Sequence, residues 1–372
     1  MKLLFLTEFY PSSPDTITGG IEARMWYVTQ TLGKENTVTV IVSHQPKQHR
    51  QEVLGRVTVL RVGPTYPYTS TGNLLARARF IIAAWREGRR RPADVVEGST
   101  FLTHPAAWFV GRSMGAKRIA WVADVWGKFW LKFGIIGLFG FLVERWAMVR
   151  SWDLVICISA HVAEKVKRVS PKQKVDVIPC GIDPSEFLRE PKKKEVGLLL
   201  WSGRLVEYKR PFFFLDAVKR LSKMDSEVHA IMIGNGPLLL KVQNYIKKEG
   251  LFGIVKIKSN LPRKVFVHAL SSAQLFVQTS VVEGFGIVVL EALAAGTPVV
   301  APDLSVYQEV TKGRGAVFFQ PDRLDDLVRK VSGVLRKKNL RRRLSKEGYL
   351  HSRSYDWEKV TMRFVPHLQK IL

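Results

Sequence analysis

The stretch Glu283-Gly284-Phe285-Gly286-Ile287-Val288-Val289-Leu290-Glu291 decides how the chain is expected to fold. An apolar run before it, residues 274–280, predicts a short buried strand, and the residues after it continue as a helix that Gly296 can end. The two glycines of the intervening turn let the backbone come close to a ligand. The free N–H groups of the first helical turn point the same way and suit an anionic or hydroxyl-rich guest. The stretch therefore predicts a ligand-binding turn between a strand and a helix.

A carboxylate stands at each end of this turn. Glu283 lies in the turn itself, where an acid suits the positive end of the helix, and Glu291 lies about two helical turns further on. A carboxylate at that position can accept hydrogen bonds from two neighbouring hydroxyls, which sugars and riboses offer. The alternative is that Glu283 is an electrostatic cap and Glu291 a solvated helix residue. The motif alone leaves both interpretations open.

The chain is strongly basic. It has 58 Lys and Arg residues against 32 Asp and Glu, which gives a formal net charge of +26. Such an excess favours attraction to phosphates, to nucleic acid or to an anionic membrane surface. Solvated surface runs such as residues 341–343 are a simpler explanation for most of it. The charge by itself does not choose among these partners.

Length and cysteine usage narrow the class of protein. A chain of 372 residues is long enough for two domains, each with its own core. Cys157 and Cys180 both lie in apolar, strand-like runs, which predicts buried thiols in a reducing, cytoplasmic compartment rather than a disulfide. Residues 1–7 are predicted to form a first strand rather than a signal peptide. No run reaches the roughly 18 apolar residues of a membrane-spanning helix.

Strand-like and helix-like segments alternate along the whole chain, and we place a domain boundary at the turn-rich residues 179–184. The alternation predicts an α/β protein with two doubly wound parallel sheets. Ligands bind such sheets beyond the carboxyl ends of the strands, so the loops after strands are candidate sites. The expected strands are residues 2–7, 38–43, 57–62, 95–97, 118–123, 154–159 and 175–179 before the boundary, and 196–201, 228–233, 254–258, 274–280, 298–301 and 316–319 after it.

Two further loops in the second half follow predicted strands. Arg204 and Lys209 flank a glycine-bearing loop, and together they can bring a fork-shaped donor and a point charge to one diphosphate. Gly234 and Asn235 open a second turn at the end of the next strand. Two cations in a surface loop and a merely tight connection are the simpler interpretations of these segments.

Two loops in the first half also follow predicted strands, so they are candidate ligand sites as well. Gly19 and Gly20 end a long loop and precede a predicted helix over residues 21–32, so their backbone can approach a phosphate. A glycine turn that closes a surface loop explains them equally well. Asp124 follows the fifth predicted strand and is expected at the same edge of the sheet, with a capping role as the alternative.

Residues 126–146 combine aromatic and apolar side chains with scattered cations. An interfacial segment has this composition, with apolar side chains at the acyl boundary and cations at lipid phosphates. A core helix preceded by a loop is the alternative. Four glycines, which disfavour an isolated helix, and the flanking Trp and Lys residues make us favour the membrane surface. The residues expected at the membrane or at an acceptor are Trp126, Lys128, Phe129, Trp130 and Lys132.

Taken in order, these motifs resemble those of the retaining nucleotide-sugar glycosyltransferases of family 4, also called glycosyltransferase group 1. The resemblance covers nearly the whole chain. It implies the GT-B fold, in which two Rossmann-like, doubly wound parallel-sheet domains face each other across a cleft. The acceptor-side domain would span residues 1–183, the nucleotide-sugar-binding domain 184–355, and a final helix over 356–372 would cross back to the first domain. The matching segments are residues 19–22 (GGIE), 177–183 (VIPCGID), 202–204 with Lys209, 234–237 (GNGP), 283–291 and 296–300 (GTPVV).

The resemblance also implies a role for each motif at the donor. Arg204 and Lys209 would hold the diphosphate, and Glu291 would hold the ribose hydroxyls. Glu283 and the backbone of the Gly284, Phe285 and Gly286 turn would meet the transferred sugar. The remaining donor contacts would come from Gly19, Gly20, Gly234 and Asn235.

One position departs from the family pattern. Members often have a histidine before the position of Asp124, and this chain has Ala123 there. Asp124 would then contact the sugar in its place, with His104 as another substitute and a structural role as the usual explanation of a lone histidine. The expected catalytic residues are Glu283, Asp124, Arg204 and Lys209.

The activity implied is transfer of a hexose, with retention, to a lipid-linked or membrane-proximal glycan at the cytoplasmic face of the membrane. A UDP- or GDP-sugar is the expected co-substrate, and no other cofactor and no obligatory metal are expected, because no Asp-x-Asp pair stands near the cleft. A non-catalytic sugar-nucleotide-binding protein and an epimerase of the same fold are alternatives. From another class, a basic nucleic-acid-binding protein lacks support from any recognisable module.

Overall fold

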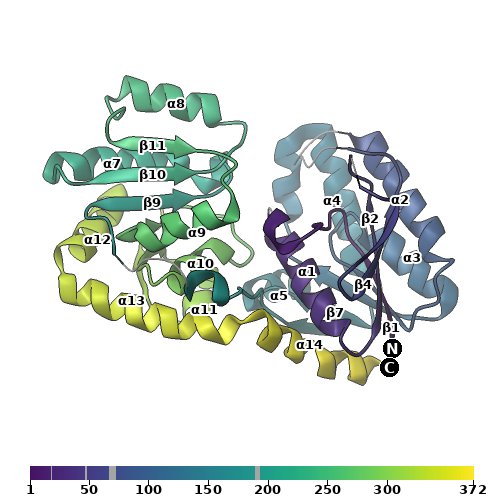
Figure 1. The fold of residues 1–372 in the computed structure, drawn as a ribbon. Helices are drawn as coiled ribbons and strands as arrows, with labels where there is room; N and C mark the ends of the chain where they lie inside the picture. The colour runs from purple at the N-terminus through teal and green to yellow at the C-terminus, as the bar shows by residue number, and fades with distance from the viewer. Residues whose placement is uncertain (18, 47, 67–72, 189–192) are drawn as a thin grey trace. The chain divides into compact units, whose positions relative to one another are not determined.

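The computed structural model of the protein describes residues 1–17, 19–46, 48–66, 73–188 and 193–372 (Figure 1). Contacts divide the chain into two compact units. Unit 1 consists of residues 1–180 together with 357–372, and unit 2 consists of residues 181–356.

Unit 1 is built on an eight-stranded sheet with the order β3-β4-β2-β1-β5-β6-β7-β8. All neighbouring pairs are parallel except β3 and β4. The seven strands predicted for this half are present, with ends that differ by at most two residues. The strands are β1 (Lys2–Leu6), β2 (Thr37–Ser43), β3 (Gln51–Leu54), β4 (Val57–Val62), β5 (Val95–Gly98), β6 (Lys117–Val122), β7 (Leu154–Cys157) and β8 (Val175–Val177).

Strand β3 was not predicted, and its presence makes the sheet mixed rather than purely parallel. It pairs antiparallel with β4 through a hairpin at Gly55, whose φ of +60° suits a residue without a side chain. None of its residues is buried. A short, exposed edge strand lacks the apolar run that identifies the buried strands.

The helices of unit 1 include one from the far end of the chain. In helix α14, Trp357 is buried and stacks on Tyr27 of α1, with ring centroids 5.5 Å apart. His367 of α14 also contacts Asp176, with 2.8 Å between Nδ1 and Oδ2. The helices are α1 (Gly20–Leu32), α2 (Leu74–Gly88), α3 (His104–Met114), α4 (Gly134–Val149), α5 (Ala160–Val169) and α14 (Trp357–Ile371), with 3-10 turns η1 (Pro14–Thr16) and η2 (Gly127–Phe133).

Unit 2 is built on a six-stranded sheet with the order β11-β10-β9-β12-β13-β14, in which every pair is parallel. All six predicted strands are present. Except in the edge strand β11, their apolar character is nearly continuous, as expected for parallel strands that have helices on both faces. The strands are β9 (Leu198–Ser202), β10 (His229–Ile233), β11 (Val255–Lys258), β12 (Leu275–Val277), β13 (Val299–Pro302) and β14 (Ala316–Phe319).

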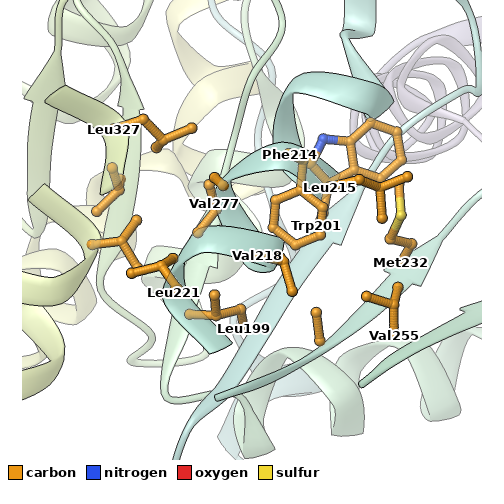
Figure 2. Packing of buried hydrophobic residues seen from close by; sticks show 14 of the residues in the cluster. Leu199, Trp201, Phe214, Leu215, Val218, Leu221, Met232, Val255, Val277 and Leu327 are labelled. Atoms are coloured by element: carbon orange, nitrogen blue, oxygen red, sulfur yellow. The ribbon is translucent and has the colours of Figure 1, made fainter. Parts of the chain in front are cut away.

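A compact core on unit 2 packs β9 and β10 against α7, around buried Trp201, Phe214 and Met232 (Figure 2). Helix α7 begins at Pro211, as the preference of proline for the first helical turn predicts. The helices are α6 (Ser185–Leu188), α7 (Pro211–Met224), α8 (Leu239–Lys248), α9 (Arg263–Ser272), α10 (Ile287–Ala294), α11 (Ser305–Thr311), α12 (Leu324–Arg336) and α13 (Lys338–Ser352), with 3-10 turns η3 (Glu207–Lys209) and η4 (Arg353–Tyr355).

Both cysteines are free and buried, as predicted. Burial raises the pKa of each thiol, Cys157 and Cys180, to about 12, so neither is a thiolate at neutral pH. Across the described ranges, no helix has the length and hydropathy needed to cross a membrane.

Candidate functional site

The loop between β9 and α7 is hydrogen-bonded to the residues that follow β12. Thr279 lies at the centre of this attachment: its Oγ1 accepts a hydrogen bond from Nε1 of Trp201 at 2.9 Å and donates to the carbonyl oxygen of Lys209 at 2.9 Å. The backbone N–H of Val281 donates to the carbonyl oxygen of Tyr208 at 3.0 Å. Because buried polar groups need partners, these bonds fix the loop in one place. They bring the predicted phosphate-binding loop next to the predicted sugar-binding turn.

Lys209 and Glu283 meet at this attachment. Nζ of Lys209 donates a hydrogen bond to Oε2 of Glu283, and both side chains are more than four-fifths buried. Arg204 lies at the start of the same loop and is exposed, and in the described part of the chain its guanidinium has no hydrogen-bond or ion-pair partner. The loop therefore carries one cation that is paired and one whose donors are available to a ligand.

Tyr307 of α11 is the neighbour of Glu283 that the sequence did not indicate. It is fully buried, and its hydroxyl lies 3.5 Å from the carbonyl oxygen of Ser280. Burial and the charge of Glu283 raise the pKa of Tyr307 well above its usual value, so the hydroxyl remains a hydrogen-bond donor. A Cβ on Gly286, which has φ +84°, would lie 3.0 Å from the ring. Glycine is needed there because of both the conformation and the ring.

The turn at Gly234 and Asn235 packs against the loop of Arg204, backbone to backbone. A Cβ on Gly234 would lie 2.0 Å from the carbonyl oxygen of Gly203, and one on Gly236 would lie 2.5 Å from that of Leu205. The N–H of Leu205 donates to the carbonyl oxygen of Asn235 at 2.9 Å. The tight-connection interpretation thus has direct support, and the connection itself fixes the cationic loop.

Glu291, the second carboxylate of the motif, lies on α10 and is buried, with 7 % of its surface exposed. It is not a solvated helix residue. Its Oε1 accepts a hydrogen bond from Nη1 of Arg263 at 2.5 Å. The same guanidinium donates to Oε2 of Glu186, from Nε at 3.0 Å and from Nη2 at 2.6 Å. The predicted ribose-binding group is therefore the buried end of a partly exposed network of two carboxylates and one guanidinium.

Neither Arg263 nor Glu186 was predicted as a site residue. Arg263 follows β11 after four residues and begins α9, so it lies in a loop-to-helix segment beyond a strand end. The rule that singled out Arg204 and Lys209 applies to it as well. Glu186 lies on the single turn α6 just after the start of unit 2, and the sequence carries no signal for its pairing.

The predicted residues of unit 1 lie on its own elements. Gly19 is the N-cap of α1 and Gly20 its first helical residue, so both are at the N-terminus of that helix. Asp124 follows β6 and is part-buried, and its Oδ1 accepts hydrogen bonds from Nζ of Lys165 at 2.7 Å and from the N–H of Val125 at 2.8 Å. Unit 2 holds Arg204, Lys209, Glu283 and Glu291, and among these the described contacts join Lys209 to Glu283.

His104 is a structural residue. It is fully buried, and its Nε2 lies 3.0 Å from the carbonyl oxygen of Trp121. Burial lowers the pKa of its imidazole to about 4, so it is neutral at physiological pH.

Residues 126–146 form η2 and α4, so the glycines that disfavour an isolated helix do not prevent one in the folded protein. A Cβ on Gly137 would lie 1.8 Å from the carbonyl oxygen of Trp130, and one on Gly140 would lie 2.7 Å from its ring. At Gly137 and Gly140 a side chain would have no room, because η2 packs directly on α4. Glu144 of α4 closes this contact: its carboxylate accepts from the N–H groups of Trp126 and Gly127 and from Nε1 of Trp130, at 2.7–3.0 Å.

Helix α4 is not an ordinary core helix, because it exposes large apolar side chains. Ile135 is 77 % exposed, Phe139 58 % and Leu142 52 %. Of the residues predicted for the membrane, Lys128 and Lys132 are exposed, and the aromatic ones are half-buried against one another. The exposed apolar side chains of α4 lie within the segment 126–146 that was predicted to be interfacial. We call this surface of α4, defined by Ile135, Phe139 and Leu142, the α4 apolar face.

Two family models match the chain, one in its first half and one in its second half. "Glycosyltransferase Family 4" matches residues 18–186, and "Glycosyl transferases group 1" matches residues 184–351. Solved structures show the same fold over the whole chain. Sucrose-phosphate synthase from Thermosynechococcus elongatus has a TM-score of 0.85 at 16% identity, covering 100% of this chain and 98% of that one. HepE of Anabaena, solved in complex with UDP and glucose, has a TM-score of 0.78 at 17% identity, with both chains fully covered.

Curated relatives are similar over longer or shorter parts of the sequence. An uncharacterized glycosyltransferase of Methanocaldococcus jannaschii is 28% identical over 214 residues, which are 56% of this chain and 57% of that protein. A human phosphatidylinositol N-acetylglucosaminyltransferase protein is 23% identical over 327 residues, 84% of this chain and 64% of that protein. The chain spans 49–61% of the length of the first four curated relatives it matches. Taken together, the family models and the fold show that this chain belongs to the group 1 glycosyltransferases, with their GT-B type of fold.

Proposed function

We propose that the protein transfers a hexose, with retention and without a metal, from a UDP- or GDP-sugar to a lipid-linked or membrane-proximal glycan. The observation that carries the donor half of this proposal is the ion pair of Lys209 and Glu283 in unit 2. Arg204 lies on the loop of Lys209, and the buried Glu291 lies on the helix that follows Glu283. Cations suited to a diphosphate and carboxylates suited to hydroxyls lie on neighbouring loops at one edge of the sheet.

The proposed chemistry follows from where charge develops. As the nucleoside diphosphate leaves the sugar, negative charge grows on the phosphate oxygen that was bonded to the anomeric carbon. Arg204 and Lys209 stabilise that charge more strongly in the transition state than in the ground state. The leaving phosphate oxygen then takes the proton of the acceptor hydroxyl, which attacks from the same face. Glu283, paired with Lys209 and beside Tyr307, binds hydroxyls of the transferred sugar.

A panel of nucleotides tests the donor half. Thermal unfolding is measured with UDP, GDP, ADP and the corresponding sugars. A ligand at a hundred times its Kd stabilises the folded state by about 2.7 kcal/mol, which is a readily measured shift. We expect UDP or GDP to raise the Tm. Stabilisation by none of these nucleotides would contradict the proposal, and a shift with ADP alone would correct the donor class.

The α4 apolar face supports the acceptor half of the proposal. Its Ile135, Phe139 and Leu142 are exposed on α4, and the cations Lys128 and Lys132 are exposed on the preceding η2. An amphipathic element of this kind binds at the lipid-water interface through buried apolar area and attraction to anionic headgroups. A peripheral membrane position would give the enzyme direct access to a lipid-linked acceptor. The human relative named above carries phosphatidylinositol in its name, which is in keeping with an acceptor of this class.

Vesicle flotation tests the membrane position. Wild-type protein is expected to float with phosphatidylcholine vesicles that contain phosphatidylglycerol and to float less with phosphatidylcholine alone. The triple variant Ile135→Ser, Phe139→Ser, Leu142→Ser is expected to remain at the bottom. Leu240→Ser with Phe252→Ser is the control, because these large apolar side chains are also exposed and lie on unit 2. Equal recovery of the triple variant and the control would rule out the α4 apolar face as the binding surface.

A further inference from the structure

Arg263 stands between two carboxylates that belong to different elements of unit 2. Its Nη1 donates a hydrogen bond to Glu291 of α10, and its Nε and Nη2 donate hydrogen bonds to Glu186 of α6. Arginine presents its five N–H donors in a rigid fork, so it can hold two carboxylates at fixed angles where lysine cannot. The arrangement fixes the direction in which the carboxylate of Glu291 points.

The surroundings of this network are apolar. The guanidinium of Arg263 lies 5.8 Å from the ring of Phe187 and 5.5 Å from that of Phe266. A carboxylate buried in such a place loses the stabilisation of its charge by water. Burial raises the pKa of Glu291, and the charge and hydrogen bond of Arg263 oppose that rise. Without Arg263, the pKa of Glu291 is expected to rise further, which favours its protonated form.

We infer that Arg263 is a positioning residue that holds the carboxylate of Glu291, in its charged form, in place for two neighbouring hydroxyls of the nucleotide ribose. This inference rests on the proposed function and names how its ribose contact is maintained. Only Oε1 of Glu291 is engaged by Arg263, and the described contacts leave Oε2 without a protein donor. A carboxylate has about four acceptor positions, so a hydroxyl pair can bind beside the guanidinium.

The other charged group that acts on Glu291 is Glu186, whose negative charge raises the pKa of Glu291. Among the other elements that contact α10, helix α11 places Tyr307 beside Glu283 rather than Glu291. Helix α13 places the neutral Ser345 on the carbonyl oxygen of Gly296, at the far end of α10. The charge of Glu291 therefore depends on the balance between Arg263 and Glu186.

The test compares the binding of UDP and of 2′-deoxy-UDP by calorimetry between pH 6.5 and 9, with GDP and 2′-deoxy-GDP used in the same way if GDP is the nucleotide that binds. For Arg263→Gln we expect UDP affinity at pH 7 to fall by about 10-fold or more, and to recover as pH rises, because Glu291 regains its charge. Affinity for 2′-deoxy-UDP should change much less. Arg263→Lys should keep the flat pH profile of the wild type.

Two further variants separate positioning from folding. If Arg263 acts through Glu291, Arg263→Gln added to Glu291→Gln causes no further loss of UDP affinity. Glu186→Gln leaves the Arg263 to Glu291 bond in place and is expected to retain UDP affinity at pH 7. Equal, pH-independent weakening of both nucleotides by Arg263→Gln, or additive losses in the double variant, would overturn the inference while leaving the donor site intact. A wild type that binds no nucleotide would instead overturn the proposed function, and the inference with it.

Discussion

Nζ of Lys209 donates a hydrogen bond to Oε2 of Glu283, and the backbone that carries this lysine is itself bonded to Thr279, four residues before the glutamate. The pair is thus fixed at both ends by one short segment of chain. Opposite charges in a mostly buried place neutralise each other, so neither residue can be changed without leaving the other uncompensated. A bound diphosphate would give Lys209 a second anionic partner.

Replacement of Lys209 should greatly reduce the rate of sugar transfer. Lys209→Ala removes a cation from the leaving group and leaves Glu283 without its ion-pair partner. We expect the rate of sugar transfer to fall by about 10²–10³, the effect of removing one preorganised donor to a developing charge. Initial rates with a saturating donor measure this, and Lys241→Ala, on an exposed part of α8, is the control. An unchanged rate for Lys209→Ala would exclude a role at the diphosphate.

The two glutamates of the motif are expected to affect different kinetic constants. Glu291→Ala removes the acceptor of the ribose hydroxyls, so it should raise KM for the donor and weaken nucleotide binding. Glu283→Ala removes a contact with the transferred sugar and should mainly lower kcat. Steady-state kinetics together with UDP titration distinguish the two. The opposite pattern would mean that the roles of the two carboxylates are exchanged.

Because η2 packs closely on α4, adding one methyl group at Gly137 should lower the stability of the protein. Gly137→Ala places a Cβ against the carbonyl oxygen of Trp130, and the backbone must shift. We expect a loss of about 1–3 kcal/mol in the free energy of unfolding, in spite of the higher helix propensity of alanine. Gly333→Ala in α12 is the matched control, because nothing lies within 4 Å of its Cβ. That variant should be unchanged or more stable by up to about 1 kcal/mol. Urea unfolding of the wild type and the two variants measures these changes in the free energy of unfolding.

Stability should depend on pH through Lys194. Burial lowers the pKa of this lysine to about 7, and its Nζ bonds to Thr297 and to the carbonyl oxygen of Ala295. Between pH 7 and about 10.5 the unfolded chain therefore binds one more proton at this site than the folded chain, so the free energy of unfolding rises with pH. Lys194→Met removes this contribution. Relative to that variant, the wild type should gain stability from pH 6.5 to 9.

Urea unfolding of wild type and Lys194→Met at three pH values measures this gain. Lys193→Met is the control, because Lys193 is an exposed neighbour, and its difference from the wild type should be the same at every pH. A Lys194→Met difference that is constant with pH would show that Lys194 is charged in the folded protein throughout this range.

Much of the fold could be predicted from the sequence because the buried strands carry their own signal. Runs such as residues 198–202 and 275–277 are apolar on both faces, and this is recognisable in the sequence whatever elements pack against them. Strand β3 could not be predicted in this way, since its four residues are held by pairing with β4 rather than by burial. The effect of the glycines of α4 could not be predicted either, because it also depends on tertiary packing. Glycine weakens an isolated helix, and here the close approach of Trp130 outweighs that tendency.

The site was predictable where one short motif carries the chemistry and not where distant elements meet. Glu283 and Glu291 are recognisable from their turn, and Lys209 from its place after a strand. The partners of these groups, Arg263 and Tyr307, come from other helices, and only the tertiary structure brings them to the two carboxylates. The ligand roles of all these residues, and of Asp124, Gly19 and Gly20, stay predictions.

The course of the chain through its two units has a practical consequence. Unit 2 starts at Gly181 and ends at Asp356, and these ends already meet: Ile182 pairs with Asp356, and its N–H donates to the carbonyl oxygen of Tyr355 at 2.8 Å. Unit 2 is therefore an insertion between two pieces of unit 1, so residues 181–356 can be excised as one continuous fragment with adjoining termini. Unit 1 offers no such fragment. A gene that stops at residue 180 lacks α14 and leaves the face of Tyr27 uncovered, so the isolated unit requires residues 357–372 to be rejoined through a linker.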